Sequence, residues 1–214
     1  MQSSFWAAPN LLSFSRIAAA PILYALTVSR WRFGFLAAAV VFLLASITDT
    51  LDGELARRQK LVSPFGIYLD TTADKILIAV LLIALAASGV TPGWMVAVIV
   101  ARELLVTGLR SYAAALGVVI PAGGWGKAKT LITIVALLLV LLEGDARQGG
   151  LLSETGPGNL LMSSLGPFTI GVWALLVAVI WTVASGAEYI RGAMPLLTGS
   201  QTAGEEMSRA ADEL

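Results

Sequence analysis

Long apolar runs separated by short polar segments dominate the pattern of this chain. Six runs approach or exceed the roughly 20 residues that a helix needs to cross the hydrocarbon core of a bilayer. They lie near residues 10–29, 33–56, 65–89, 92–114, 127–143 and 167–190. Because backbone polar groups in lipid must be satisfied within their own segment, each run is predicted to be an α-helix. The predicted fold class is an all-α integral membrane protein with about six transmembrane helices.

The polar segments divide the chain into one membrane domain and a tail. Residues 144–166 are rich in Gly and Ser and are predicted to be an external loop. Residues 1–197 form the membrane domain, and residues 198–214 form a polar C-terminal tail that is predicted to be disordered. The first residues lack the basic start and the cleavage site of a signal peptide, so we expect the first span to be retained.

The basic residues predict the orientation in the membrane. They follow the second and sixth runs and open the fifth: Arg57, Arg58, Lys60, Lys127, Lys129 and Arg191. Because positive charge accumulates on the cytoplasmic side, both termini and the 57–64 loop are predicted to be cytoplasmic, in a multi-pass protein of the cytoplasmic membrane. Arg30 and Arg32, between the first two runs, favour the opposite orientation.

Composition narrows the possible chemistry. The 214 residues are 57% hydrophobic and 13% charged, which excludes an ordinary soluble protein. The chain has no cysteine and no histidine, so thiolate or imidazole metal ligands, disulfides and a histidine general base are excluded. A bound metal would have oxygen ligands, which favours Mg²⁺, Mn²⁺ or Ca²⁺. The net charge is zero and the cations are scattered, so nucleic-acid binding is not expected.

Four aspartates within this apolar chain are the strongest candidates for a functional site. Asp49 and Asp52 are three residues apart, and Asp70 and Asp74 are four apart, so each pair shares one face of a helix. A short loop joins the two helices, and we expect them to be antiparallel neighbours whose acidic faces meet near the cytoplasmic surface. Bridging by one or two divalent ions would remove the repulsion between the carboxylates. The alternative is a structural ion-pair network with Arg57, Arg58 and Lys75.

Small and basic residues beside the aspartates suit a phosphorylated ligand. Gly53 and Gly66 let a bulky group approach the helix backbone, and Ala56 is also small. Arg57 supplies a planar fork for phosphate oxygens. In the first run, Asn10 and Arg16 could each bind a phosphate, cap the helix or face lipid headgroups.

These residues together resemble the signature of the CDP-alcohol phosphotransferase family, D-x-x-D-G-x-x-A-R, eight residues, then G-x-x-x-D-x-x-x-D. All eight fixed positions are filled, by Asp49, Asp52, Gly53, Ala56, Arg57, Gly66, Asp70 and Asp74. The resemblance implies a six-helix fold, usually homodimeric, and a site for two Mg²⁺ or Mn²⁺ ions held by Asp49, Asp52, Asp70 and Asp74. It implies that Asp74 is the general base, and that a CDP-linked donor binds at Asp52, Gly53, Ala56, Arg57 and Gly66. We expect Asn10 to contact the donor as well.

Three further segments resemble the branch of the family that makes phosphatidylglycerophosphate: PNLLSFSRIAAAP at 9–21, ARELLVTGLR at 101–110 and GKAKT at 126–130. One departure is Thr71, where many relatives have proline. The segments contribute four cations that suit an acceptor with its own phosphate: Arg102, Arg110, Lys127 and Lys129. Arg102 could instead neutralise Glu103 or Glu54, and the two lysines could be ordinary cytoplasmic anchors.

The predicted function is transfer of a phosphatidyl group from CDP-diacylglycerol to sn-glycerol 3-phosphate, which gives phosphatidylglycerophosphate and CMP. The donor's acyl chains would lie in the lipid bilayer. The nearest alternative is the same chemistry with inositol phosphate or phosphatidylglycerol as acceptor. An alternative of another class is a divalent-cation transporter, but the intramembrane acids gather toward one face, which favours an enzyme at the membrane surface.

Overall fold

Six long helices form the protein in the part of the chain that the structure describes. This computed structural model describes the backbone of residues 8–59, 64–118 and 125–197, and the side chains of residues 10–48, 65–118 and 129–194. The long helices are α1 (Ala8–Val28), α2 (Gly34–Gln59), α3 (Pro64–Ala87), α4 (Gly93–Ala115), α5 (Trp125–Arg147) and α7 (Ile170–Leu197). They coincide with the six predicted runs, so the prediction of a helical protein is confirmed.

The segment between α5 and α7 is more structured than predicted. Helix α5 continues to Arg147, and the short helix α6 (Gly156–Met162) follows where only a loop was predicted. Strands β1 (Ser164–Leu165) and β2 (Phe168–Thr169) then pair antiparallel, and α7 begins at Ile170, close to the predicted start near residue 167. The reason is local: Gly166 has a φ of +70°, a conformation that suits glycine and reverses the chain.

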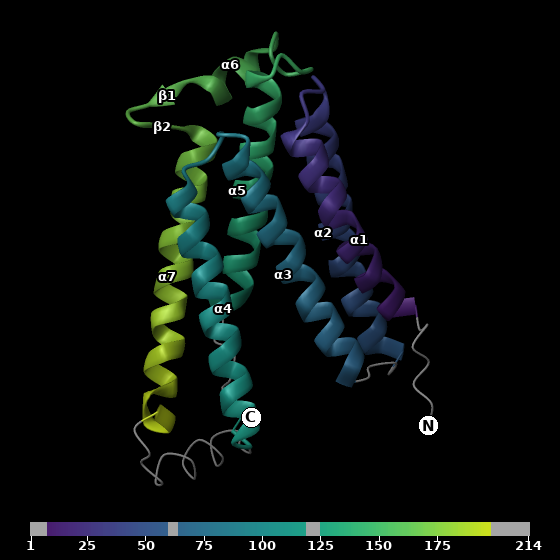
Figure 1. The fold of residues 1–214 in the computed structure, drawn as a ribbon, viewed down its shortest axis with the longest axis vertical. Helices are drawn as coiled ribbons and strands as arrows, with labels where there is room; N and C mark the ends of the chain where they lie inside the picture. Colours follow the sequence, from purple (N-terminus) through teal and green to yellow (C-terminus); the bar gives the residue numbers. More distant parts are fainter. Residues whose placement is uncertain (1–7, 60–63, 119–124, 198–214) are drawn as a thin grey trace.

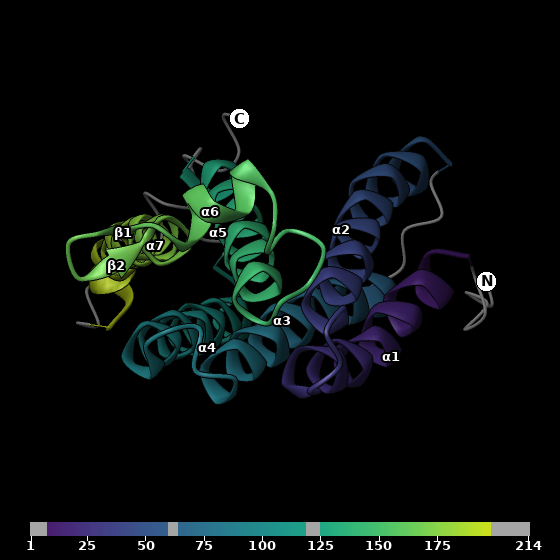
Figure 2. The same cartoon turned by 90° about the horizontal axis from the view of Figure 1, so that it is seen from above.

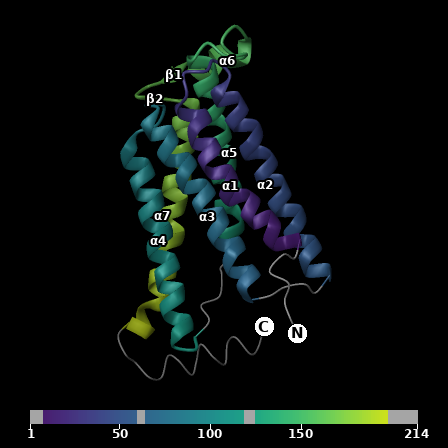
Figure 3. The same ribbon diagram turned by 45° about the vertical axis from the view of Figure 1, so that its right-hand side comes forward.

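The long helices pack as a bundle with α1 and α2 on one side and α4 and α7 on the other (Figures 1 and 2). Helix α1 packs against both α2 and α3, α5 packs against α2 and α7, and α4 packs mainly against α7. Figure 3 shows α4 and α7 side by side. Among the described residues, α2 and α3 have few direct contacts. Helix α1 packs against both of them over the described residues. The predicted meeting of the acidic faces involves Asp49 and Asp52, whose side chains lie outside the described residues.

Leucine and alanine side chains fill the core between the helices. Leu23, Leu81, Leu137 and Leu175 are fully buried and come from four different helices. At one crossing an aromatic side chain packs directly on a helix backbone, since a Cβ atom added to Gly144 of α5 would lie 2.3 Å from the Phe35 ring of α2. Only a residue without a side chain fits there.

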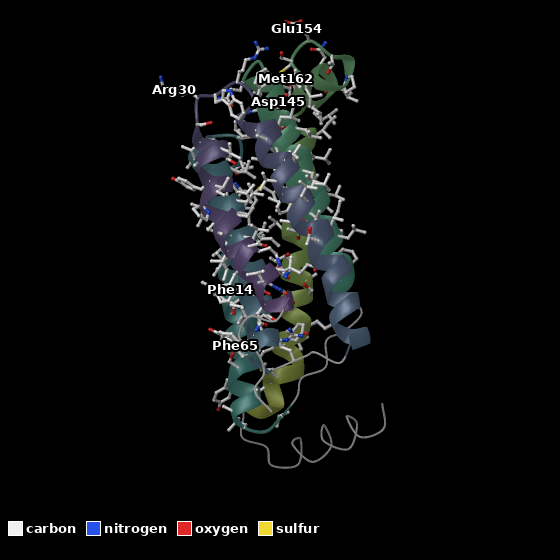
Figure 4. All side chains as sticks on the ribbon, turned by 90° about the vertical axis from the view of Figure 1, so that its right-hand side faces the viewer. Phe14, Arg30, Phe65, Asp145, Glu154 and Met162 are labelled. Carbon is white, nitrogen blue, oxygen red and sulfur yellow. The ribbon has the colours of Figure 1, made fainter. Side chains whose placement is uncertain are left out.

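The bundle has two distinct ends. We call the end at which α2 finishes and α3 begins the aspartate end, and the end that carries α6 and the β-hairpin the hairpin end (Figure 1). Figure 4 places Phe14 and Phe65 toward the aspartate end, and Arg30, Asp145 and Glu154 at the hairpin end. Since α3 and α5 start at the aspartate end while α4 and α7 run toward it, residues from distant parts of the sequence meet there.

Two helices have the length and apolar composition of a membrane span in the described part of the chain. They cover Asn10–Val28 and Ile170–Met194, and the apolar stretch Gly34–Thr48 is shorter. The helices that carry the aspartates and the cations fall outside this group. The number of crossings therefore stays a prediction.

Candidate functional site

Asp70 and Asp74 lie near the start of α3, at the aspartate end. Together with Gly66 they are spaced by four residues, so all three lie along one face of the helix. The side chain of Asp70 is 48% exposed and that of Asp74 is 37% exposed. Both carboxylates can therefore be reached by a ligand from outside the bundle.

Helix α1 presents a buried polar face to these carboxylates. Asn10, Ser13 and Arg16 are each at most 5% exposed and recur every three residues. The Nη2 atom of Arg16 lies 2.5 Å from Oδ1 of Asp70, and its Nη1 atom donates to Oδ1 of Asp74. The Ser13 hydroxyl also donates to Oδ1 of Asp70, at 3.3 Å. A single guanidinium thus bridges both carboxylates and offsets part of their negative charge.

Sequence reasoning assigned Asn10 to the site but left Arg16 open and did not include Ser13. Because Arg16 is 4% exposed, the possibility that it faces lipid headgroups is wrong. A signal was present, since three polar residues at helical spacing in an apolar helix indicate a buried polar face. The identity of the helix that this face would contact was not encoded in that spacing.

The other half of the signature lies in the last third of α2. Asp49, Asp52, Gly53, Ala56 and Arg57 belong to the continuous helix that ends at Gln59, so Asp49 and Asp52 share one face. Their side chains lie outside the described residues. The path of the backbone takes them to the aspartate end, where α1 packs between α2 and α3.

The chemistry of the donors present fits a hard divalent cation. Carboxylate oxygens are the ligands that Mg²⁺ and Mn²⁺ prefer, and the bonds from Arg16 and Ser13 to Asp70 both use Oδ1. Among the described side chains, no group of three acidic residues comes together. The pair on α3 would therefore need the two carboxylates of α2 to complete a metal site.

A second polar cluster joins α4, α5 and α7. The Nη1 atom of Arg102 donates to Glu103 at 3.0 Å, and its Nη2 atom donates to the Ser185 hydroxyl at 2.9 Å. The Nζ atom of Lys129 donates to the same Glu103 oxygen. One of the open alternatives for Arg102, neutralisation of Glu103, is therefore present in the structure. Lys127 begins α5 beside Lys129, but its side chain lies outside the described residues.

Two more cations connect this cluster with the aspartates. Arg110, two turns along α4 from Arg102, donates to the Tyr189 hydroxyl of α7. Lys75 follows Asp74 on α3, and it interacts attractively with Asp74 and repulsively with Arg102 and Arg110. The two clusters therefore lie within electrostatic range of each other, with Lys75 between them.

Positive charge is in excess in this second cluster. In the described part of the chain it contains Arg102, Arg110 and Lys129, with Lys75 of α3 in electrostatic range, and Glu103 is the acid bonded to two of these cations. Buried or half-buried cations repel one another unless an anion compensates them. The cluster is thus suited to an anionic ligand beside the carboxylates, and the lining would disfavour a cationic one.

The hairpin end carries a separate polar group that does not reach the aspartates. Glu143 is fully buried, accepts hydrogen bonds from Thr169 at 2.7 Å and lies 2.5 Å from the Arg147 guanidinium. A cavity of about 420 Å³ lies beside Arg147, between the α3–α4 connection and the β-hairpin. Since Glu143 pairs with Arg147 and Thr169, these contacts join α5 to the start of α7.

Comparisons with known proteins agree with the signature. Residues 6–184 match the family model described as CDP-alcohol phosphatidyltransferase. Three relatives named CDP-diacylglycerol--glycerol-3-phosphate 3-phosphatidyltransferase come from Bacillus subtilis, Pseudomonas fluorescens and Rickettsia bellii. The Bacillus protein is 37% identical over 193 residues, which cover 85% of this chain and 92% of the relative. The other two are 34% and 32% identical, over 88% and 86% of this chain and 91% and 93% of their own lengths.

Proposed function

The chain belongs to the CDP-alcohol phosphatidyltransferase family, and we propose that it transfers a phosphatidyl group from CDP-diacylglycerol to sn-glycerol 3-phosphate. The products are phosphatidylglycerophosphate and CMP. The observation that carries this proposal is the similarity to relatives named for this reaction, which extends over most of both chains. The excess of positive charge around Arg102 and Lys129 favours an acceptor that brings its own phosphate.

A divalent metal is part of this proposal. Two ions of Mg²⁺ or Mn²⁺ would be held by the four aspartates Asp49, Asp52, Asp70 and Asp74. The exposure of the two carboxylates on α3 supports this, because a metal ion can reach them. When bound, the metal would polarise the donor phosphate and offset the negative charge of the leaving CMP. Arg16 would keep Asp70 and Asp74 oriented, because it holds one oxygen of each.

The donor would bind where α1 and α2 approach α3. Asn10 is buried on α1 in line with Arg16, which supports a contact with the donor's phosphates. Gly53, Ala56 and Gly66 would leave room for the nucleotide, and Arg57 would bind a phosphate oxygen. The acyl chains would remain in the bilayer while the pyrophosphate reaches the aspartate end.

In the reaction, the free primary hydroxyl of glycerol 3-phosphate would attack the phosphorus that carries the diacylglycerol. Asp74 would take the hydroxyl proton, a new P–O bond would form, and the bond from that phosphorus to the bridging oxygen would break to release CMP. Arg102, Arg110, Lys127 and Lys129 would bind the acceptor's phosphomonoester. Most of the catalysis would come from positioning and charge neutralisation.

The membrane topology follows from the same proposal. All six long helices would cross the cytoplasmic membrane, with the aspartate end facing the cytoplasm, where the water-soluble acceptor is available. Helices α3 to α5 would tolerate their charged residues because these pair within the bundle, as Asp70 and Asp74 do with Arg16 and as Glu103 does with Lys129. Two copies would associate as a homodimer.

The experiment that tests the function is CMP release by the purified protein with CDP-diacylglycerol. Glycerol 3-phosphate, inositol phosphate and phosphatidylglycerol are compared as acceptors, with Mg²⁺, Mn²⁺ or a chelator. We expect CMP release only when glycerol 3-phosphate is the acceptor and a divalent metal is present. Release solely with another acceptor would overturn the substrate assignment, and cation flux without CMP release would support a transporter.

A matched pair of variants tests the proposed base. Asp74→Asn removes a carboxylate that contacts Arg16, whereas Glu154→Gln removes an exposed one at the hairpin end (Figure 4). We expect a loss of turnover of at least about a hundredfold in the first variant, the usual contribution of general acid–base catalysis. The second variant should keep normal turnover. Normal turnover in Asp74→Asn contradicts the role of Asp74.

A further inference from the structure

Helix α7 contacts the cations of α4 through three residues that the family signature does not include. Ser185 and Tyr189 are four residues apart and so share one face of the helix, and Gly186 lies beside them. Each of the three contacts an arginine of α4. These contacts are the basis of the inference.

Ser185 fixes the guanidinium of Arg102. The serine is 4% exposed, and its hydroxyl donates to the Thr182 carbonyl oxygen at 3.0 Å. Because its one proton is used there, the oxygen is left to accept from Nη2 of Arg102 at 2.9 Å. Glu103 holds Nη1 at 3.0 Å, so the guanidinium is tethered on two sides.

Gly186 makes room for the Arg102 side chain. A Cβ atom at this position would lie 3.1 Å from both Cγ and Nε of Arg102. Such contacts are tighter than normal, so any larger residue must displace the arginine by a few tenths of an ångström. Because both ends of the guanidinium are tethered, that displacement would strain at least one of its hydrogen bonds.

Tyr189 holds Arg110 in the same way. Its hydroxyl accepts from Nη2 of Arg110, whose Cζ atom lies 4.9 Å from the centre of the tyrosine ring. The arginine is therefore held by a hydrogen bond and by a cation–π contact. One helix thus orients both arginines.

We propose that Ser185, Gly186 and Tyr189 are positioning residues that orient Arg102 and Arg110 toward the phosphate monoester of the acceptor, so that α7 sets the affinity for this substrate. The inference rests on the proposed function. Arginine has five N–H donors, and in the described residues two of those of Arg102 are used by Glu103 and Ser185. The remaining N–H donors and the excess positive charge would allow Arg102 and Arg110 to bind a phosphate. A contact that served only to join two helices would not need this excess of charge.

The test is a comparison of two glycine substitutions on α7. Gly186→Ala places a methyl group against Arg102, whereas a Cβ atom at Gly192 would meet nothing within 4 Å. Both changes raise helix propensity equally, so they differ only in the contact with Arg102. Steady-state CMP release is measured with purified protein while glycerol 3-phosphate and CDP-diacylglycerol are varied separately.

We expect Gly186→Ala to raise the KM for glycerol 3-phosphate about tenfold, equivalent to about 1.4 kcal/mol, with an unchanged KM for CDP-diacylglycerol. Gly192→Ala should leave both constants unchanged. A second pair is Tyr189→Phe, which removes the acceptor of Arg110, and Tyr112→Phe, which removes a hydroxyl on the half-exposed surface of α4. The first should raise the same KM severalfold, and the second should not.

The outcomes separate the inference from the function on which it rests. If the unmodified protein releases no CMP with glycerol 3-phosphate, the proposed function fails. If it does release CMP but Gly186→Ala and Tyr189→Phe match their controls, the positioning role is wrong. An equal rise in the KM values of both substrates also overturns it, because a general disturbance of the bundle would act on donor and acceptor alike.

Discussion

Replacing Arg16 by methionine removes the buried positive charge that lies between Asp70 and Asp74. Methionine keeps most of the apolar stem but donates no hydrogen bond. Two charge-assisted hydrogen bonds are lost, and each such bond contributes roughly 1.5 to 3 kcal/mol to stability. Two such bonds would contribute about 3 to 6 kcal/mol if fully buried. Because the two carboxylates are 48% and 37% exposed, water weakens both bonds and lowers this contribution. We therefore expect a total loss of about 2 kcal/mol.

The assay is thermal unfolding of the purified protein in detergent, with a chelator or with excess Mn²⁺. For a chain of this size the loss corresponds to a fall in melting temperature of about 4 to 8 °C in the chelator. Added Mn²⁺ should recover more stability in Arg16→Met than in the unmodified protein, because the ion then meets two carboxylates without a competing cation. Arg30→Met, at the hairpin end, is the control and should change neither value (Figure 4).

Two results would refute this reasoning. An unchanged melting temperature in the chelator would mean that Arg16 contributes no net stability through Asp70 and Asp74. A fall that Mn²⁺ does not reduce would mean that the carboxylates bind no metal, or that the arginine acts by packing alone. The second result would also weaken the proposed metal site.

The remaining predictions concern stability away from the site. Gly144→Ala forces a methyl group into the Phe35 ring and should cost about 1 to 3 kcal/mol in thermal unfolding, while Gly108→Ala, where a Cβ meets nothing within 4 Å, should cost nothing. Equal melting temperatures would contradict the close contact between α2 and α5. Thr169→Val removes a donor to buried Glu143 and should cost about 1 to 3 kcal/mol without raising the KM for glycerol 3-phosphate; a raised KM would show that the hairpin end affects the site.

Helix positions were predictable because their cause is local. A long apolar run in a chain with the composition of a membrane protein has few alternatives to a helix, because its backbone must satisfy its own hydrogen bonds. All six long helices appear where the runs lie. The prediction failed at residues 144–169, where α6 and the hairpin form. There the structure depends on short capping and turn contacts, such as the Thr155 oxygen that accepts from the Gly158 amide at 3.2 Å. A loop-like composition does not reveal such contacts.

The sequence predicted which side chains supply the chemistry of the candidate site, but not which residues those side chains contact. Spacing placed Asp70 and Asp74 on one helix face, and this is confirmed by α3. It did not predict that α1 would bury Arg16 against them, 54 and 58 residues away. It also did not predict that both α2 and α3 would pack against α1 over the described residues.

For the cations, too, the residues were predictable from the sequence and their contacts were not. The sequence identified Arg102, Arg110 and Lys129 as a group, but the partners of the two arginines on α7 lie 79 to 83 residues away in the chain. No local pattern marks Ser185 or Tyr189, because a serine and a tyrosine in an apolar helix serve many roles.

The sequence by itself determined the helices, the set of oxygen and guanidinium groups available for chemistry, and which of them share a helix face. These properties depend on backbone hydrogen bonds and side-chain spacing within one segment. The tertiary structure decided which faces meet: α1 against the aspartates of α3, and α7 against the arginines of α4. Those pairings depend on how side chains of all six helices fill a common core, and no single segment contains that information.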